Sequence, residues 1–288
     1  MAEYLLRDED LQDLRGKVII VTGGATGIGR ALVQLAHDHG AKVAACDVNI
    51  EAGEELEQQL PTDFLFKKCD VSIWKDVIEF FQETYQRFGT IDTVISNAAI
   101  NKVENLDDLD ATDITDGEEL REPDLSVLKV NMIGTWYVTR CAIHFFRKHP
   151  ETRSQLVLFG SVASYFDTPP LYTYCASKAG VLGLFRALRT QTVKYNISVN
   201  MIAPWMTLTD MVTDHVKKVW GDLPANTPLD VAKASLLCVV RPEINGKAFL
   251  INGGKFTEVE DKLDETQAVW LGSELDKNMR EGQRRLID

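Results

Sequence analysis

Short apolar runs alternate with amphipathic stretches along most of the chain. Seven runs have the length and residue types of strands, at 18–21, 43–46, 64–66, 93–96, 156–159, 198–202 and 248–251. Helical periodicity is clearest between them at 28–39, 73–88, 125–146 and 174–195. The first run, VIIV, has no polar alternation, which is typical of a strand buried on both faces. The pattern predicts an α/β fold with a doubly wound, seven-stranded parallel sheet and helices on both faces.

One domain accounts for most of the chain. Its 288 residues, 45% of them hydrophobic, are enough for one large α/β domain, whereas a second full domain would be crowded. We therefore predict a single domain over 1–255 and a C-terminal extension over 256–288. The extension is highly charged, but Trp270 and Leu271 give it an apolar anchor, so a docking tail and a disordered segment are both open.

The charge pattern narrows the choice of partners. A formal net charge of −12 disfavours nucleic acid as a partner, because a polyanion needs a basic face. The segment 104–124 holds ten acids and one base, which predicts a solvated loop or an acidic lip that repels acidic ligands. Residues 1–17 contain no long apolar run, so we expect no secretory signal, no membrane anchor and a cytoplasmic protein.

Cysteines and histidines give no sign of a metal centre. The five cysteines form no CxxC pair, which argues against a disulfide framework or a zinc site. The five histidines include nothing like HExxH. We predict reduced thiols and no metal.

A glycine-rich turn follows the first predicted strand. Residues 22–30 read TGGATGIGR, and a helical pattern starts at once. A strand that turns sharply into a helix directs backbone N–H groups and the positive end of the helix dipole to one spot, which suits a pyrophosphate. Gly23, Gly27 and Gly29 let the backbone approach closely, with Thr26 and Ile28 between them. Such turns also occur for structural reasons, but this position between strand and helix favours phosphate binding.

The second predicted strand ends in a carboxylate. Asp47 follows the glycine turn by about twenty residues, where a ribose 2′-hydroxyl of a dinucleotide would lie. An acid there accepts a hydrogen bond from NAD and repels the 2′-phosphate of NADP. Positions 25, 26, 48 and 49 carry no Lys or Arg to offset such a phosphate. The alternative is an ordinary solvated acid at a strand end.

Further motifs follow in order: CDV at 69–71, NAA at 97–99, GSVASY at 160–165 and YCASKAG at 174–180. Together with the glycine turn they resemble the short-chain dehydrogenase/reductase family over about residues 15 to 255. Asp70 resembles the family's adenine-contacting acid, and residues 97–99 resemble its Asn-Asn-Ala-Gly motif in altered form. The last two phrases resemble members from fungal secondary metabolism.

The resemblance implies a catalytic tetrad of Asn131, Ser161, Tyr174 and Lys178. Hydride leaves an alcohol carbon only if the hydroxyl proton is removed as well. A free tyrosine, with a pKa of about 10, is a poor base near neutrality. Lys178 follows Tyr174 by one helical turn, and we expect its ammonium, with an oxidised nicotinamide, to favour the phenolate. Ser161 would donate a hydrogen bond to the substrate oxygen, and Asn131 would kink its helix and hold a water for proton relay to Lys178.

The expected activity is that of an oxidoreductase with a Rossmann-type domain that transfers hydride between NAD(H) and a secondary alcohol or ketone. The expected cofactor contacts are Gly23, Thr26, Gly27, Ile28, Gly29, Asp47, Asp70, Val71, Asn97, Ala98, Ala99, Tyr174, Lys178, Pro204, Thr207 and Thr209. Ala99 and Trp205 both replace glycines of the family pattern. Trp205 either narrows the site and stacks on a flat substrate or merely packs under its loop.

The expected substrate is a lipophilic or aromatic small molecule. Its expected contacts are Ser161, Tyr165, Leu171, Trp205, Met206 and Met211. Small residues at 176, 179, 180 and 183 would let helices pair, and the resemblance implies a homodimer or homotetramer. Two other functions stay open: a cyclase or isomerase that reuses the fold, and a nucleotide-sensing protein without turnover. The complete tetrad argues against both.

Overall fold

A computed structural model describes residue 4 and residues 6–60, 62–104 and 122–287. Most of the acidic segment 104–124 lies outside these residues. Across the part of the chain that is described, no helix combines the length and apolar character needed to cross a bilayer.

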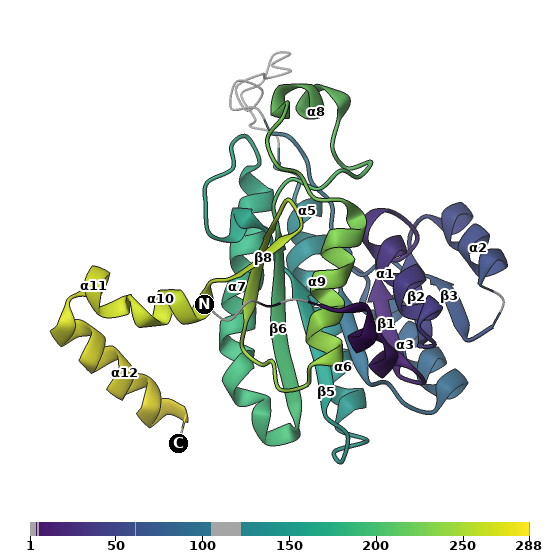
Figure 1. The fold of residues 1–288 in the computed structure, drawn as a ribbon, viewed down its shortest axis with the longest axis horizontal. Coiled ribbons are helices and arrows are strands. Elements are labelled where there is room, and N and C mark those ends of the chain that lie inside the picture. The colour runs from purple at the N-terminus through teal and green to yellow at the C-terminus, as the bar shows by residue number, and fades with distance from the viewer. Residues whose placement is uncertain (1–3, 5, 61, 105–121, 288) are drawn as a thin grey trace.

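The centre of the molecule is a twisted sheet in the order β3-β2-β1-β4-β5-β6-β7-β8 (Figure 1). The strands are β1 (Val18–Thr22), β2 (Lys42–Asp47), β3 (Phe64–Lys68), β4 (Thr93–Ser96), β5 (Ser154–Phe159), β6 (Ile197–Pro204), β7 (Ala248–Asn252) and β8 (Lys255–Glu258). All seven predicted strands are present, and their neighbours pair in parallel. The order reverses at β1, between β2 and β4, as in a doubly wound sheet.

The predicted count of seven strands is corrected by β8, which pairs antiparallel with β7. Asn252 pairs with Lys255, so Gly253 and Gly254 form a two-residue hairpin turn. Both glycines have positive φ, at 56° and 74°, the conformation that the favoured two-residue hairpin turn requires. The predicted domain boundary between residues 255 and 256 therefore falls inside a strand.

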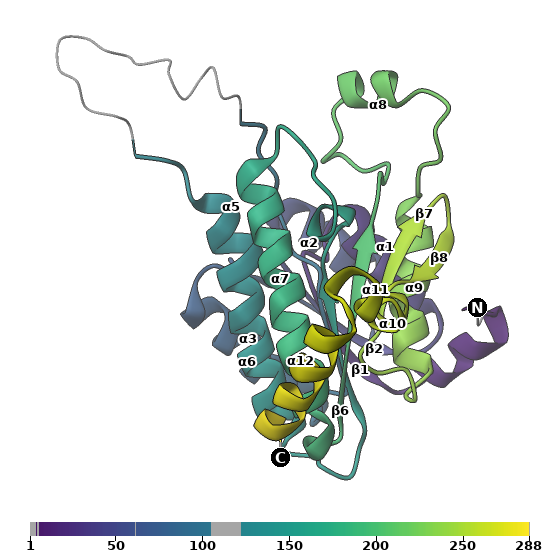
Figure 2. The same cartoon turned by 90° about the vertical axis from the view of Figure 1, so that its left-hand side faces the viewer.

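Helices cover both faces of the sheet (Figures 1 and 2). They include α1 (Gly27–Asp38), α2 (Ile50–Gln59), α3 (Trp74–Phe88), α5 (Ser126–Leu128), α6 (Thr135–Phe146), α7 (Tyr172–Gln191), α8 (Asp214–Trp220) and α9 (Pro228–Val240). Single turns or short irregular helices lie at η1 (Asp8–Leu14), η2 (Lys129–Gly134), η3 (Val162–Ser164) and η4 (Val193–Tyr195). The long helix predicted at 125–146 is interrupted, because η2 is a π-helix inserted between α5 and α6.

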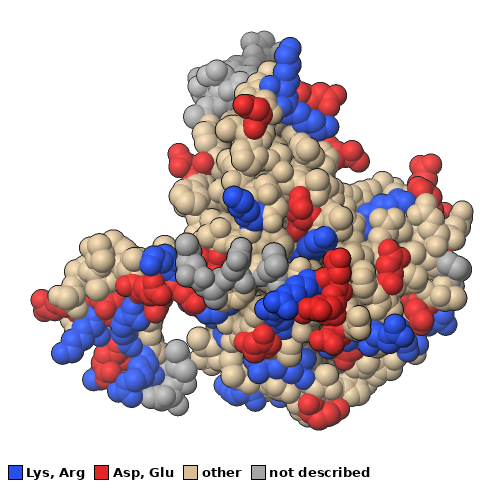
Figure 3. Space-filling model, in the orientation of Figure 1, with Lys and Arg blue, Asp and Glu red and all other residues tan. Residues whose placement is uncertain are grey.

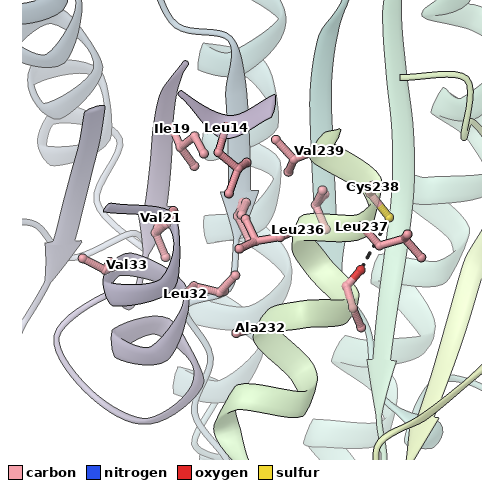
Figure 4. Close-up of a cluster of buried hydrophobic side chains, with 14 of the residues drawn as sticks. Leu14, Ile19, Val21, Leu32, Val33, Ala232, Leu236, Leu237, Cys238 and Val239 are labelled. Carbon is pink, nitrogen blue, oxygen red and sulfur yellow. Dashed lines mark hydrogen bonds between the residues drawn. The ribbon is translucent and has the colours of Figure 1, made fainter. Parts of the chain in front are cut away.

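The core consists of two hydrophobic clusters on opposite faces of the sheet. Ile19 and Val21 of β1 belong to one cluster and Ile20 to the other, as the alternation of a strand requires. The first cluster packs β1 against Leu32 of α1 and Leu236 of α9 (Figure 4). The second packs the sheet against α3, α6 and α7. Every residue of β1 is buried, in agreement with its uninterrupted apolar sequence.

The C-terminal extension folds into α10 (Glu260–Glu265), α11 (Gln267–Leu271) and α12 (Ser273–Ile287). In Figure 1, α11 and α12 project from one side of the body. Of the expected apolar anchor, Trp270 is exposed and Leu271 is half-buried, so Trp270 does not serve as an anchor. Acidic and basic side chains are interspersed on this extension and on the face of the body that Figure 3 shows.

Candidate active site

A cavity of about 900 Å³ lies at the carboxyl ends of the parallel strands. Nearly all of the predicted site residues line it: Gly23, Thr26, Gly27, Ile28, Gly29, Asp47, Asp70, Val71, Asn97, Ala98, Ala99, Ser161, Leu171, Tyr174, Lys178, Pro204, Trp205, Met206, Thr207, Thr209 and Met211. Two predicted residues, Asn131 and Tyr165, do not. We call the part formed by Gly23, Gly27, Gly29 and Asp47 the glycine-turn end, and the part formed by Leu171, Trp205, Met206, Met211 and Trp220 the aromatic end.

At the glycine-turn end, main-chain geometry decides which residues fit. A Cβ on Gly29 would lie 1.8 Å from the carbonyl oxygen of Gly23, and one on Gly23 would lie 2.8 Å from Cα of Ala98. Gly27 has a φ of 52° and begins α1. No side-chain hydrogen bond from Thr26 caps this helix, so its first-turn N–H groups face the cavity without that partner. This cradle fits a phosphate group.

The carboxylate of Asp47 is held in place at the end of β2. It accepts hydrogen bonds from the backbone N–H groups of Ala25, at 3.1 Å, and Asn49, at 3.0 Å. Arg30, directly after the turn, is directed towards α2, where it donates hydrogen bonds to Glu55 at 3.1 Å and Gln59 at 3.0 Å. Asp47 lines the cavity, and Arg30, the cation of the glycine turn, is engaged by α2.

The ends of β1 and β4 are joined by hydrogen bonds. The carboxamide of Asn97 donates to the carbonyl oxygens of Thr22, at 2.9 Å, and Gly23, at 3.0 Å. The N–H of Ala98 donates to the hydroxyl of Thr22 at 3.1 Å. Asp70 accepts hydrogen bonds from the N–H and hydroxyl of Ser72, at 2.9 and 2.7 Å. These contacts fix one wall of the cavity.

Ser161, Tyr174 and Lys178 form the central wall. Ser161 follows β5 as the N-cap of η3, and its hydroxyl accepts a hydrogen bond from the N–H of Ala163 at 3.2 Å. Tyr174 and Lys178 lie one turn apart on α7, and the Lys178 ammonium lies 5.6 Å from the centroid of the Tyr174 ring. The ammonium is buried and donates to the carbonyl oxygen of Phe159 at 2.8 Å.

Burial shifts both titrations at this wall. It lowers the pKa of Lys178 to about 8, since a buried ammonium loses its hydration. Burial also raises the pKa of Tyr174, while a hydrogen bond with Ser161 acts in the opposite direction. In the protein alone, the pKa of Tyr174 is therefore raised. The ammonium of Lys178 donates its hydrogen bond to the carbonyl oxygen of Phe159, and the expectation that it favours the phenolate together with an oxidised nicotinamide stays a prediction.

Asn131 lies behind this wall, inside the π-helix η2, and is fully buried. Its amide donates to the carbonyl oxygen of Ile100, at 2.8 Å, and to the hydroxyl of Ser177, at 3.1 Å, while its own oxygen accepts the N–H of Ile100 at 2.9 Å. The expected distortion of the helix is present at this residue. The hydrogen bonds tie Asn131 to the strand-end segment and to α7.

Tyr165 does not contact the cavity, and its predicted role in substrate contact is corrected. Its hydroxyl donates to the carboxylate of Glu260, 2.9 Å away, on the side of the chain where α10 packs. The ring also lies 5.9 Å from the guanidinium of Arg186. A polar partner beyond the predicted domain holds the side chain away from the cavity.

The aromatic end contains residues that sequence reasoning missed. Trp220, at the end of α8, meets Trp205 edge-on at 5.4 Å between ring centroids. Its indole N–H donates to the carbonyl oxygens of Leu223 and Pro224, at 3.0 and 3.2 Å. Asp167 and Asp210 add carboxylates to a lining that is otherwise mainly apolar here. No short-range pattern marks Trp220, because the segment between β6 and α9 lacks clear periodicity.

Comparison with known proteins decides the family. The profile of the short chain dehydrogenase family matches residues 17–220. The chain belongs to the short-chain dehydrogenase family. The predicted family membership is thus confirmed.

Individual relatives match most of the length of this short-chain dehydrogenase. The chain is 32% identical over 299 residues to the 5′-hydroxyaverantin dehydrogenase of Dothistroma septosporum, with 95% of each chain covered. It is also 32% identical to the NADP-dependent dehydrogenase M3 of a Phoma species, over 82% of this chain and 74% of the relative. A solved 3-ketoacyl-(acyl-carrier-protein) reductase from Brucella melitensis, complexed with NADH, superposes with a TM-score of 0.74 at 25% identity. That alignment covers 84% of this chain and 98% of the other.

Proposed function

We propose that this short-chain dehydrogenase is an NAD(H)-dependent oxidoreductase that interconverts a secondary alcohol and a ketone on a lipophilic or aromatic small molecule. One observation carries the proposal. Ser161, Tyr174 and Lys178 line the same cavity as the glycine turn and Asp47. Acid/base groups and a dinucleotide cradle therefore meet where a substrate carbon could lie beside a nicotinamide ring.

The protein's part in the reaction is proton transfer and orientation. A bound nicotinamide supplies the hydride chemistry that side chains lack. Tyr174 takes the hydroxyl proton during oxidation and returns it during reduction. Ser161 donates a hydrogen bond to the substrate oxygen and stabilises its developing negative charge. The buried ammonium of Lys178 offsets negative charge on the phenolate, and Asn131 holds the neighbouring Ile100 segment and Ser177 of α7 in place.

Asp47 supports a preference for NAD over NADP. Its carboxylate is held by two backbone N–H groups, so it cannot easily turn away from a 2′-phosphate. Arg30 is engaged by Glu55 and Gln59 of α2 and thus offers no free cation to that phosphate. Cofactor names among the relatives differ, since one is NADP-dependent and another was solved with NADH. The proposed preference therefore rests on this chain's own residues.

The aromatic end supports a lipophilic substrate. Trp205 and Trp220 together present two large rings, and Leu171, Met206 and Met211 add apolar surface. One relative is named as a dehydrogenase of 5′-hydroxyaverantin. We propose a secondary alcohol or ketone on a ring system as the substrate class of this chain.

Turnover assays test the proposal. Purified protein with NAD and a panel of hydroaromatic alcohols should give growth of the NADH absorbance band, and Tyr174→Phe should abolish it. Tyr172→Phe is the matched control, because Tyr172 is an exposed tyrosine on the same helix. Turnover of a substrate without change in that band would instead support a cyclase or isomerase. Equal turnover of small polyols would contradict the proposed substrate class.

We also propose a homodimer or homotetramer formed through α7. Ala176, Ala179 and Gly183 are exposed along this helix and would permit close approach of a second helix. Gly180 has another role, because a Cβ there would lie 2.8 Å from the sulfur of Met132 in the same chain. Light scattering at micromolar concentration checks the assembly, and a monomeric mass would contradict it.

A further inference from the structure

Three parts of the molecule meet at the carboxylate of Glu260, the first residue of α10. The side chain is only 3% exposed. Both of its oxygens are engaged by donors from three side chains: Tyr165 Oη at 2.9 Å and Arg186 Nη2 at 2.8 Å on Oε1, and Arg186 Nε at 2.9 Å and Arg189 Nη1 at 2.8 Å on Oε2. The side chain of Glu258, which is also acidic, accepts a hydrogen bond from the backbone N–H of Glu260 at 2.9 Å.

This carboxylate stays ionised despite its burial. Burial alone would raise the pKa of Glu260, but hydrogen bonds and charge from Arg186, helped by Tyr165 and Arg189, outweigh it and leave the pKa lowered. Apolar residues of similar volume often replace a buried ion pair without loss of stability. Whatever they add to stability, the four directed hydrogen bonds fix one relative geometry of Glu260, Tyr165 and α7.

The three donors belong to the two elements that carry the candidate catalytic groups. Tyr165 directly follows η3, the turn that Ser161 caps. Arg186 and Arg189 lie on α7, the helix of Tyr174 and Lys178. A second link between the same elements comes from the hydroxyl of Ser164, which donates to the carbonyl oxygen of Lys178 at 2.8 Å. Glu260 itself comes from the C-terminal extension, beyond the residues that match the family profile.

We propose that Glu260 is a positioning residue that holds Ser161 against Tyr174 by binding Tyr165 and α7 at once. The proposal rests on the proposed function of this wall. Ser161 lowers the pKa of Tyr174, whereas burial and the neighbouring Cys175 raise it. Displacement of Ser161 would therefore leave the phenol harder to ionise. The functional unit then extends into α10, past the predicted domain boundary at residue 255.

Two variants separate positioning from folding. Glu260→Gln keeps the shape but removes the charge, and Tyr165→Phe keeps the ring over Arg186 but removes the hydroxyl. We expect kcat to fall roughly 10- to 100-fold in both, because small displacements of catalytic groups have effects of that size. The dissociation constant of NADH should be unchanged, and the midpoint of the kcat profile for oxidation should move to higher pH. Glu265→Gln, in an exposed pair with Lys262 on the same helix, should behave as wild type.

Several results would overturn the proposal. One is that the variants fold and keep the wild-type kcat and the wild-type midpoint of the kcat–pH profile. Another is that kcat and NADH affinity fall by the same factor while that midpoint stays unchanged. If Glu260→Gln fails to fold, Tyr165→Phe decides. Failure of the proposed function would look different, since wild-type protein would then lack turnover with every alcohol tested. In that case the titration of the Tyr174 phenol can still be followed by NMR on protein with isotope-labelled tyrosine, where the signal missing from Tyr174→Phe identifies Tyr174. An unchanged titration midpoint of Tyr174 in Tyr165→Phe would refute the positioning role.

Discussion

The glycine-turn end and the aromatic end of the cavity are constructed in different ways. At the first, the backbone decides: Gly29 tolerates no Cβ, and Asp47 and Asn97 are held by main-chain N–H and carbonyl groups. At the second, large side chains such as Trp205 and Trp220 contact mainly one another and the loop that follows. We infer that substitutions at the glycine-turn end lower cofactor affinity strongly, whereas substitutions at the aromatic end change KM for the substrate by smaller factors.

The largest effect is expected from Gly29→Ala. Its new Cβ would lie 1.8 Å from the carbonyl oxygen of Gly23, so the turn must shift. Loss of two hydrogen bonds to a charged phosphate would weaken NADH binding by about 4 kcal/mol, on the order of 1,000-fold. Fluorescence titration with NADH measures this. Gly282→Ala, in α12 with nothing within 4 Å of the new Cβ, is the control, and equal affinity in the two variants would remove the contrast between the ends.

The central wall between the two ends, which contains the buried Lys178, should make the stability of the protein depend on pH. Burial lowers the pKa of Lys178 from its ordinary value of 10.5 to about 8. Between these values the unfolded chain holds more protons than the folded one, so this residue makes the free energy of unfolding rise with pH, by about 3 kcal/mol in total. We expect the free energy of unfolding, measured with urea at several pH values in this range, to rise less steeply with pH in Lys178→Met than in wild type. Parallel slopes would mean that the ammonium is not desolvated.

Asp47→Ala should have an intermediate effect and sharpen the contrast. Removal of a carboxylate that accepts a hydrogen bond from a ribose hydroxyl should weaken NAD by about 2 kcal/mol, roughly 30-fold, and relax discrimination against NADP. Ratios of kcat/KM for NAD and NADP measure it. Glu51→Ala, an exposed acid in the first turn of α2, should leave the ratio as it is. The same ratio in both variants would refute the role of Asp47.

The smallest effect is expected from Trp205→Leu. Loss of an aromatic contact between Trp205 and the ring system of the proposed substrate should cost about 1 kcal/mol, so KM for an aromatic alcohol should rise roughly fivefold while NADH affinity stays constant. Trp270→Leu, an exposed tryptophan on α11, serves as control. A change in NADH affinity with no change in KM would reverse the assignment of the two ends.

Local signals in the sequence were sufficient for most of the fold. The seven parallel strands are short runs rich in apolar residues, and a clear helical period follows β1, β3, β4 and β5. Both patterns depend only on neighbouring residues. The strand β8 was missed although its turn was visible, since Gly253 and Gly254 stand between residues that pair as a hairpin. The π-helical insertion at Asn131 has no comparable local pattern, because it depends on contacts with Ile100 and Ser177.

The candidate site divides in the same way. The glycine turn, Asp47 and Ser161 were located at strand ends, whose place at one edge of a parallel sheet is fixed by topology. The helical members of the tetrad, Asn131, Tyr174 and Lys178, were located by the resemblance to the family. The direction of the Tyr165 side chain could not be predicted from the sequence, because its partner Glu260 lies 95 residues away. Trp220 was missed for a similar reason: only the folded loop brings it to Trp205. Long-range polar partners are thus what the sequence pattern could not supply.

The hairpin that adds β8 also determines how the sheet can meet other molecules. Outermost strands present unpaired main-chain groups, which invite the addition of a foreign strand and lead to aggregation. Here one edge strand is β8, which is only four residues long and carries Lys255 and Glu258. The other edge strand is β3, which ends in Lys67 and Lys68. Short, charged edge strands of this kind resist strand addition, and the strands between them are already paired on both sides.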